Sequence, residues 1–123
     1  MDNRFRRDER MHRKEDFKRV FKQGRRFSAS GLTVWILTRD AEVEAKPRLG
    51  LAIPKAYGNA VARNRLKRLI RETFRLNKAR LPAAVDMVFS ARSTLAKPRY
   101  QTIEPLVIKL WTLASLPLSS PGC

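Results

Sequence analysis

Cysteine and histidine are almost absent from this chain of 123 residues, which has one of each, Cys123 and His12. A disulfide framework or a zinc site built on cysteine and histidine needs several such residues at close spacing, so both are excluded. Ser-His-Asp catalysis would have to use His12, which lies in a segment that we expect to be mobile. The acidic residues are scattered singly and no glycine-rich phosphate loop occurs, which argues against a two-metal nuclease and a nucleotide hydrolase. We therefore expect no catalytic residue and no metal ligand in this chain.

Long apolar runs are also missing. No stretch of about 18 apolar residues exists, and the N-terminal residues lack the apolar core of a signal peptide. We expect a soluble, cytoplasmic protein without a membrane partner. Hydrophobic residues make up 43% of the chain, which is too many for a disordered basic tail and enough for one domain with its own core. We place this domain at residues 14–116, between a basic mobile arm, 1–13, and a disordered tail, 117–123.

Negative charge is scarce. Asp and Glu number 11 against 27 Lys and Arg, which gives a net charge of +16. Such a charge repels itself in the free protein and favours a partner with a phosphate backbone. Much of it lies in residues 60–77, whose apolar period of 3.6 predicts one amphipathic helix. Its predicted apolar side consists of Ala62, Leu66, Leu69, Ile70 and Thr73. Asn59 is expected to cap its start, and Asn77 is a candidate left-handed stop.

The other face of this predicted helix carries cations opposed by a single carboxylate, Glu72. Its polar residues are Arg63, Asn64, Lys67, Arg68, Arg71 and Arg75. A solvated helix face usually mixes the two signs, because opposite charges four residues apart attract each other. Here like charges stand three and four residues apart. We interpret the face as a contact for a polyanion rather than as a solvated surface.

Other periodicities predict a short helix at residues 14–23, ended by Gly24, and a last helix that carries Pro105. Because proline is tolerated only in the first turn of a helix, we expect the last helix to begin at Ile103 or Glu104. Alternation of apolar and polar residues predicts strands at 31–38, 48–53 and 85–91.

Two phenylalanines on the first predicted helix allow two interpretations. Phe17, Val20 and Phe21 share one face, and the default for such a stripe is core packing. Aromatic rings surrounded by cations also suit the stacking of single-stranded bases. In the predicted strands, the small residues Gly50 and Ala52 leave a shallow face beside a tryptophan, which is a weak indication of a binding floor. The residues alone favour core packing for the stripe.

The run from Gly50 to Arg75 resembles the signature of the bacterial ribonuclease P protein component family. The triplet Arg63-Asn64-Arg65, followed by Lys67, Arg68 and Arg71, resembles the arginine-rich motif of that family. Residues 15–21 and Gly24 resemble its first helix. The resemblance covers residues 4–113.

This resemblance implies an α/β (α+β) two-layer sandwich in the order α-β-β(-β)-α-β-α. It also implies a left-handed β-α-β crossover, against the general right-handed rule. The implied function is that of a protein subunit of ribonuclease P, a ribonucleoprotein whose active site lies in its RNA. With Mg²⁺ held mainly by RNA, the catalytic RNA removes the 5′ leader of precursor tRNA. No protein oligomer is required.

The resemblance also implies two sets of binding residues. The leader would bind at Phe17, Phe21, Trp35 and Lys55. The catalytic RNA would bind at Arg63, Asn64, Arg65, Lys67, Arg68 and Arg71.

Three other functions are weighed against this one. A ribosomal or ribosome-assembly protein fits the charge and length equally, but a purely structural RNA binder does not need an aromatic cleft. A helix-turn-helix DNA-binding protein needs a short helix just before residue 60, where the sequence predicts a strand and a loop. A protein nuclease acting alone lacks the acidic or histidine cluster that its chemistry requires.

Overall fold

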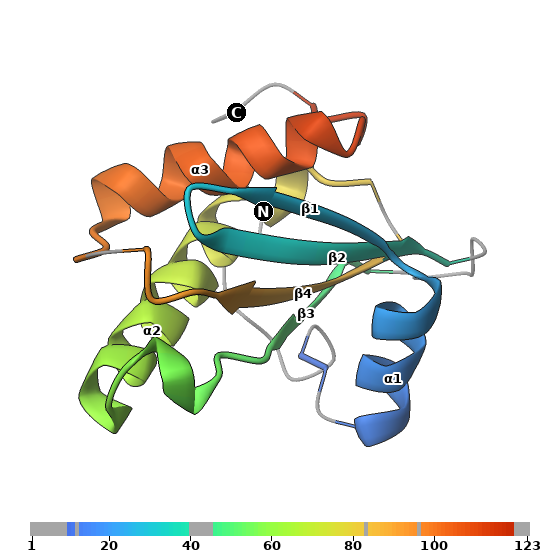
Figure 1. The fold of residues 1–123 in the computed structure, drawn as a ribbon. Helices are drawn as coiled ribbons and strands as arrows, with labels where there is room; N and C mark the ends of the chain where they lie inside the picture. Colours follow the sequence, from blue (N-terminus) through green and yellow to red (C-terminus); the bar gives the residue numbers. More distant parts are fainter. Residues whose placement is uncertain (1–9, 12, 40–45, 83, 96, 120–123) are drawn as a thin grey trace.

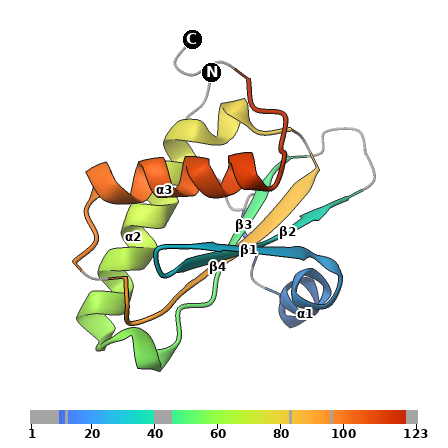
Figure 2. The ribbon, with the colours of Figure 1, turned by 45° about the horizontal axis from the view of Figure 1, so that its top comes forward.

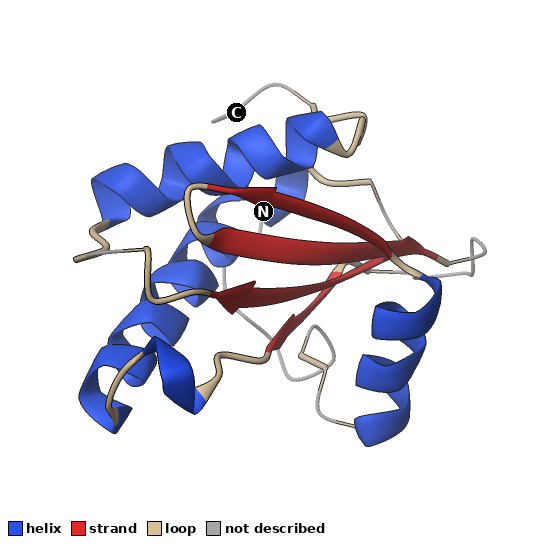
Figure 3. Ribbon diagram, viewed as in Figure 1, coloured by secondary structure: helices blue, strands red, loops and turns tan. Residues whose placement is uncertain are grey.

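The computed structural model describes residues 10–11, 13–39, 46–82, 84–95 and 97–119. Along the chain the elements are α1 (Lys14–Gln23), β1 (Arg25–Ala29), β2 (Leu32–Thr38), β3 (Arg48–Leu51), η2 (Lys55–Tyr57), α2 (Ala60–Asn77), η3 (Lys78–Arg80), β4 (Val85–Ala91) and α3 (Tyr100–Leu113). Three strands precede α2, so the longer of the two implied element orders is the one observed (Figures 1 and 3).

The strands form one sheet in the order β1-β2-β4-β3. β2 is antiparallel to both β1 and β4, whereas β3 is parallel to β4. Parallel neighbours need a long connection, and α2 provides it between β3 and β4. Figure 2 shows α2 and α3 on one side of the sheet and α1 on the other. The expected α/β fold class is confirmed.

Alternate residues of the strands divide between these two sides. Val34, Met87 and Phe89 are fully buried in the main core, with α2 and α3. Their neighbour Val88 points the other way and packs with Val20 of α1 in a second, smaller cluster. The period of two in the sequence thus predicts both faces of β2 and β4 correctly.

The bounds of α2 are those predicted, and the Asn59 side chain caps it by accepting a hydrogen bond from the Ala62 N–H at 2.9 Å. The prediction of a left-handed stop at Asn77 is wrong. Asn77 has a right-handed conformation, with φ −119° and ψ −1°, and the chain continues into η3. Its buried amide donates to the Thr73 carbonyl at 2.9 Å and to Glu104 at 3.0 Å. These two bonds hold it inside the helix, where it joins α2 to α3.

The predicted start of α3 is also wrong, because the helix begins at Tyr100 and contains Pro105 in its interior. Proline at this place removes the hydrogen bond to the carbonyl of Gln101. Gln101 and Pro105 are both exposed, so the Gln101 carbonyl can bind water instead. The first turn is secured by Thr102, whose hydroxyl accepts a hydrogen bond from the Arg99 N–H at 3.0 Å.

Both ends of the described chain are attached to the domain. The Met11 N–H donates to the Leu49 carbonyl at 2.8 Å, and the Met11 side chain is buried, so this part of the expected mobile arm lies along the edge strand β3. The Ser119 N–H donates to the Arg80 carbonyl at 3.0 Å, so packing extends past the expected domain end at residue 116. Residues 1–9, His12 and 120–123 lie outside the described residues.

Candidate nucleic-acid interface

Three aromatic side chains gather on the α1 side of the sheet. The ring centroids of Phe17 and Phe21 are 6.4 Å apart, and those of Phe21 and Trp35 are 4.9 Å apart in an edge-to-face arrangement at 89°. Phe21 is 40% exposed, while Val20 on the same helix is fully buried. The apolar stripe therefore has a core member and an accessible aromatic part, which we call the aromatic cluster (Phe17, Phe21 and Trp35).

The Phe17 ring packs directly against Gly50. A Cβ atom at Gly50 would lie 2.9 Å from both Cε1 and Cζ of Phe17, which is closer than packed atoms allow. Ala52 and Phe17 both pack against the smaller core cluster that contains Val20 and Val88. The shallow face expected beside Trp35 is therefore covered at Gly50 by the Phe17 ring. The small residues of β3 and of the turn after it make room for α1 rather than for open solvent.

One cation contacts the aromatic cluster directly. The Arg26 guanidinium lies 5.8 Å from the centroid of the Trp35 ring, within the range of a cation–π contact. Lys55 is exposed at the first residue of η2, beyond β3. The described ring contacts join Phe17, Phe21 and Trp35 and do not include Lys55. The structure thus brings three of the four predicted leader-binding residues into one cluster and places the fourth, Lys55, in η2.

A buried carboxylate, which the sequence analysis missed, fastens α1 beside this cluster. Asp86 of β4 is inaccessible to solvent and lies opposite Arg48 in the parallel register. The Arg48 guanidinium donates two hydrogen bonds to it, at 2.8 and 2.6 Å, and Arg39 Nε lies 3.0 Å from its Oδ1. Arg19 of α1 lies 3.5 Å from Asp86 and 3.0 Å from Asp16. This network ties the helix that carries two of the aromatic residues to the sheet.

The outward face of α2 is basic. Asn64, Arg65, Arg68 and Arg71 are exposed, and Lys67 is half-buried. Arg63 departs from the predicted arrangement: it is half-buried, and its Nη1 donates to the Gly58 carbonyl at 2.7 Å. At about 100° per residue, Arg63 falls on the arc of the buried side chains, which explains this position. It closes the loop before α2.

A cavity joins the basic helix to the aromatic cluster. It has a volume of about 240 Å³, and its lining includes Lys67 and Arg71 from α2, Phe17 from α1, Arg10 from the N-terminal segment and Leu51 from β3. Phe17 therefore belongs both to the aromatic cluster and to the cavity beside the basic face of α2. Two sets of residues that the sequence places far apart form one continuous region.

The family resemblance of the sequence is tested by direct comparison with known proteins. A family model described as Ribonuclease P matches residues 5–115. The chain belongs to the ribonuclease P protein family.

Its relatives include the ribonuclease P protein component of Clostridium novyi, 35% identical over 109 residues, with 89% of this chain and 96% of the relative covered. That of Syntrophobacter fumaroxidans is 45% identical over 91 residues, covering 73% and 74% of the two chains. The solved structure of the Staphylococcus aureus RNase P protein matches with a TM-score of 0.78 at 28% identity, covering 89% and 97%.

Membership of the ribonuclease P protein family gives this chain the role of a protein subunit in tRNA processing. It replaces the alternative of a ribosomal protein, which rested on charge and length alone. In the described part of the chain, no helix is long and apolar enough to cross a membrane. The same residues contain no group of three or more His, Cys, Asp or Glu side chains placed to hold a metal ion.

Proposed function

We propose that this chain assists a catalytic RNA in removing the 5′ leader from precursor tRNA, by holding the leader and the RNA on two adjoining surfaces. The observation that carries the proposal is the cavity shared by Phe17 and the cations Lys67 and Arg71. An aromatic floor suits unpaired bases, and a row of cations suits phosphates. Their continuity suits a strand that passes from one RNA to the other.

The aromatic cluster is the proposed leader site. Phe21 offers an accessible ring, held in place by its edge-to-face contact with Trp35. Bases of any sequence can stack on such a ring, as the varied leaders of different precursors require. Arg26, beside Trp35, and the exposed Lys55 would contact phosphates at the edge of this site.

The exposed face of α2 is the proposed site for the catalytic RNA. Arg65, Arg68 and Arg71 take part in no ion pair within 4.0 Å among the residues that the structure describes. Their guanidinium groups are therefore available for phosphate oxygens, which they can bind through two parallel hydrogen bonds. Lys67 and Asn64 extend this face.

We place the cleavage chemistry and the Mg²⁺ ions in the RNA. The described residues do not fit a protein-bound Mg²⁺ site, because no three of their His, Cys, Asp and Glu side chains are grouped and Asp86 is already paired with arginines. The proposed contribution of the chain is to position the substrate. Cleavage of a precursor by the protein without RNA would contradict this assignment.

The decisive experiment compares two RNAs and two variants in the reconstituted holoenzyme. Phe21→Ala removes the accessible ring, and Leu113→Ala, on α3, removes an apolar side chain that is 50% exposed. Loss of one stacked base costs about 1–3 kcal/mol, so Phe21→Ala should weaken binding of a precursor with a leader of several nucleotides by about 5- to 150-fold. Mature tRNA should bind both variants and the parent alike. Equal losses for both RNAs would refute the leader site.

A further inference from the structure

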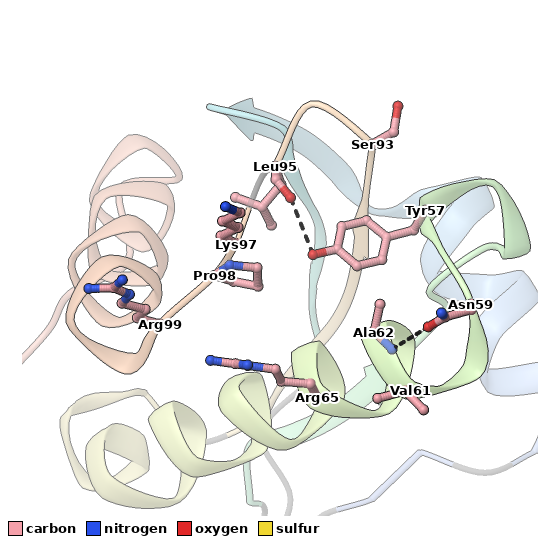
Figure 4. Close-up of a pocket in the computed structure, with 10 residues that line it drawn as sticks. All are labelled: Tyr57, Asn59, Val61, Ala62, Arg65, Ser93, Leu95, Lys97, Pro98 and Arg99. Atoms are coloured by element: carbon pink, nitrogen blue, oxygen red, sulfur yellow. Dashed lines mark hydrogen bonds between the residues drawn. The ribbon is translucent and has the colours of Figure 1, made fainter.

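A second cavity lies on the opposite flank of α2 from the one at Phe17. It has a volume of about 640 Å³ and is formed by two segments (Figure 4). One runs from Tyr57 of η2 to Arg65 of α2, and the other runs from Ser93, after β4, to Arg99 before α3. Arg65 and Lys67 point about 160° apart around the helix axis, so the two cavities use separate sides of α2.

The cations of this cavity have no acidic partners. Arg65, Lys97 and Arg99 line it, and no carboxylate is among the lining residues. In the described chain, none of the three lies within 4.0 Å of a carboxylate oxygen, whereas Arg75 on the same helix is paired with Glu72. Three exposed like charges around one hollow repel each other until an anion enters.

Hydrogen bonds hold the first part of the wall opposite α2. The Tyr57 hydroxyl donates to the Leu95 carbonyl at 3.2 Å, and the Arg92 N–H donates to the Gly31 carbonyl at 2.8 Å. Gly31 has a φ of +88°, and a Cβ atom there would lie 2.7 Å from the Leu95 nitrogen. The turn between β1 and β2 therefore supports this segment closely. The part of this wall that ends at Leu95 is therefore already in place for a ligand.

Besides its three cations, the cavity is lined by aromatic and apolar side chains against which a base could pack. Figure 4 shows the Tyr57 ring and the Pro98 ring on the side of the hollow away from α2, with Val61 and Ala62 on the helix side. Val61 is 78% exposed, so an apolar side chain is available to a ligand. The volume falls within the range of about 300–1,000 Å³ that is typical of small-ligand sites. A concave site of this size excludes a duplex and admits a nucleotide turned out of its stack.

We propose that this cavity takes one unpaired nucleotide of the catalytic RNA. The base lies against Tyr57 and Val61, and the flanking phosphates bind Arg65, Lys97 and Arg99. The inference rests on the proposed function, which supplies the RNA. It extends that function by assigning a base-sized site to the flank of α2 remote from the leader.

The charge part of the proposal is tested with the double variant Lys97→Gln/Arg99→Gln. The matched control is Lys109→Gln, an exposed lysine on α3 outside the cavity. Affinity for the catalytic RNA alone is measured between about 50 and 200 mM salt. Two lost phosphate contacts should lower the slope of log affinity against log salt by about 1.4–1.8, while the control keeps the parent slope. A double variant that behaves like the control overturns the cavity site.

The base part is tested at Tyr57. Tyr57→Phe keeps the ring and Tyr57→Leu removes it, and thermal unfolding confirms that both variants fold. Chemical probing of the catalytic RNA should show an unpaired base that the parent and Tyr57→Phe protect and that Tyr57→Leu leaves reactive. Absence of such a base overturns the proposal. If the parent protein fails to bind the catalytic RNA at all, the proposed function itself is wrong, so the two failures are distinguishable.

Discussion

Replacement of Asp86 by asparagine tests the network that fastens α1. The substitution keeps the size of the side chain and removes its charge. Arg48 and Arg39 then lose a carboxylate, although their side chains are only 22% and 19% exposed. Removing one partner of a fully buried pair costs about 3–5 kcal/mol, and an exposed pair contributes about 0–1 kcal/mol. Because these guanidinium groups retain some contact with water, we expect a loss of about 2–4 kcal/mol.

Urea unfolding of the isolated protein measures this loss as a lower transition midpoint at an unchanged slope. The matched control is Glu72→Gln, because Glu72 is 45% exposed and pairs with Arg75, which is 33% exposed. The control should change the free energy of unfolding by less than about 1 kcal/mol. If Asp86→Asn costs no more than the control, the network is not what holds α1. The reasoning about the position of the aromatic cluster would then fail with it.

Three further outcomes are expected. Gly50→Ala pushes the Phe17 ring, which would lie 2.9 Å from the new Cβ, and should weaken the binding of a long-leader precursor but not of mature tRNA. Arg68→Ala should lower the salt slope of RNA affinity by about 0.7–0.9 and leave the melting temperature unchanged, because Arg68 is exposed. Burial, together with a hydrogen bond to Glu104, raises the pKa of Tyr100 from 10.0 to about 12. The resulting stabilisation is present below pH 10 and is lost between about pH 10 and 12, so Tyr100→Phe should remove this alkaline loss of stability in unfolding measurements.

Elements with strong periodicity were predictable from the sequence. The bounds of α1, α2 and β4 agree with the prediction, because each has an apolar face that repeats at the period of its secondary structure. β1 was not recognised from its pattern, and only the family resemblance allowed a third early strand. Its residues are mostly exposed, and it exists because it pairs with β2 across the turn Ser30-Gly31. Both turn residues have positive φ, 50° and 88°, as a two-residue hairpin turn requires.

The site was predictable only in part, because its parts depend on tertiary contacts. The spacing of Phe17 and Phe21 is equally consistent with a core stripe, and only packing shows that Phe21 stays 40% exposed. Asp86 and Arg48 meet because β3 and β4 pair in parallel with these two residues opposite each other, a register that no local pattern encodes. The cavity at Tyr57 likewise forms between segments separated in the sequence by most of α2 and by β4.

Three of the acidic residues that the structure describes lie between elements, which leaves the exposed face of α2 basic in a chain of net charge +16. Asp86 and Asp16 lie between α1 and the sheet, and Glu104 accepts a hydrogen bond from Asn77 between α2 and α3. Among the carboxylates that the structure describes, these three lie where elements meet and pair there with cations or accept hydrogen bonds, whereas Glu72 pairs with Arg75 on the same helix. The exposed face of α2 keeps its cations at spacings of three and four, which destabilises a free helix by about 0.2–0.5 kcal/mol for each pair. Packing of Leu66, Ile70 and Phe74 outweighs this repulsion, and the proposed binding of RNA would remove it.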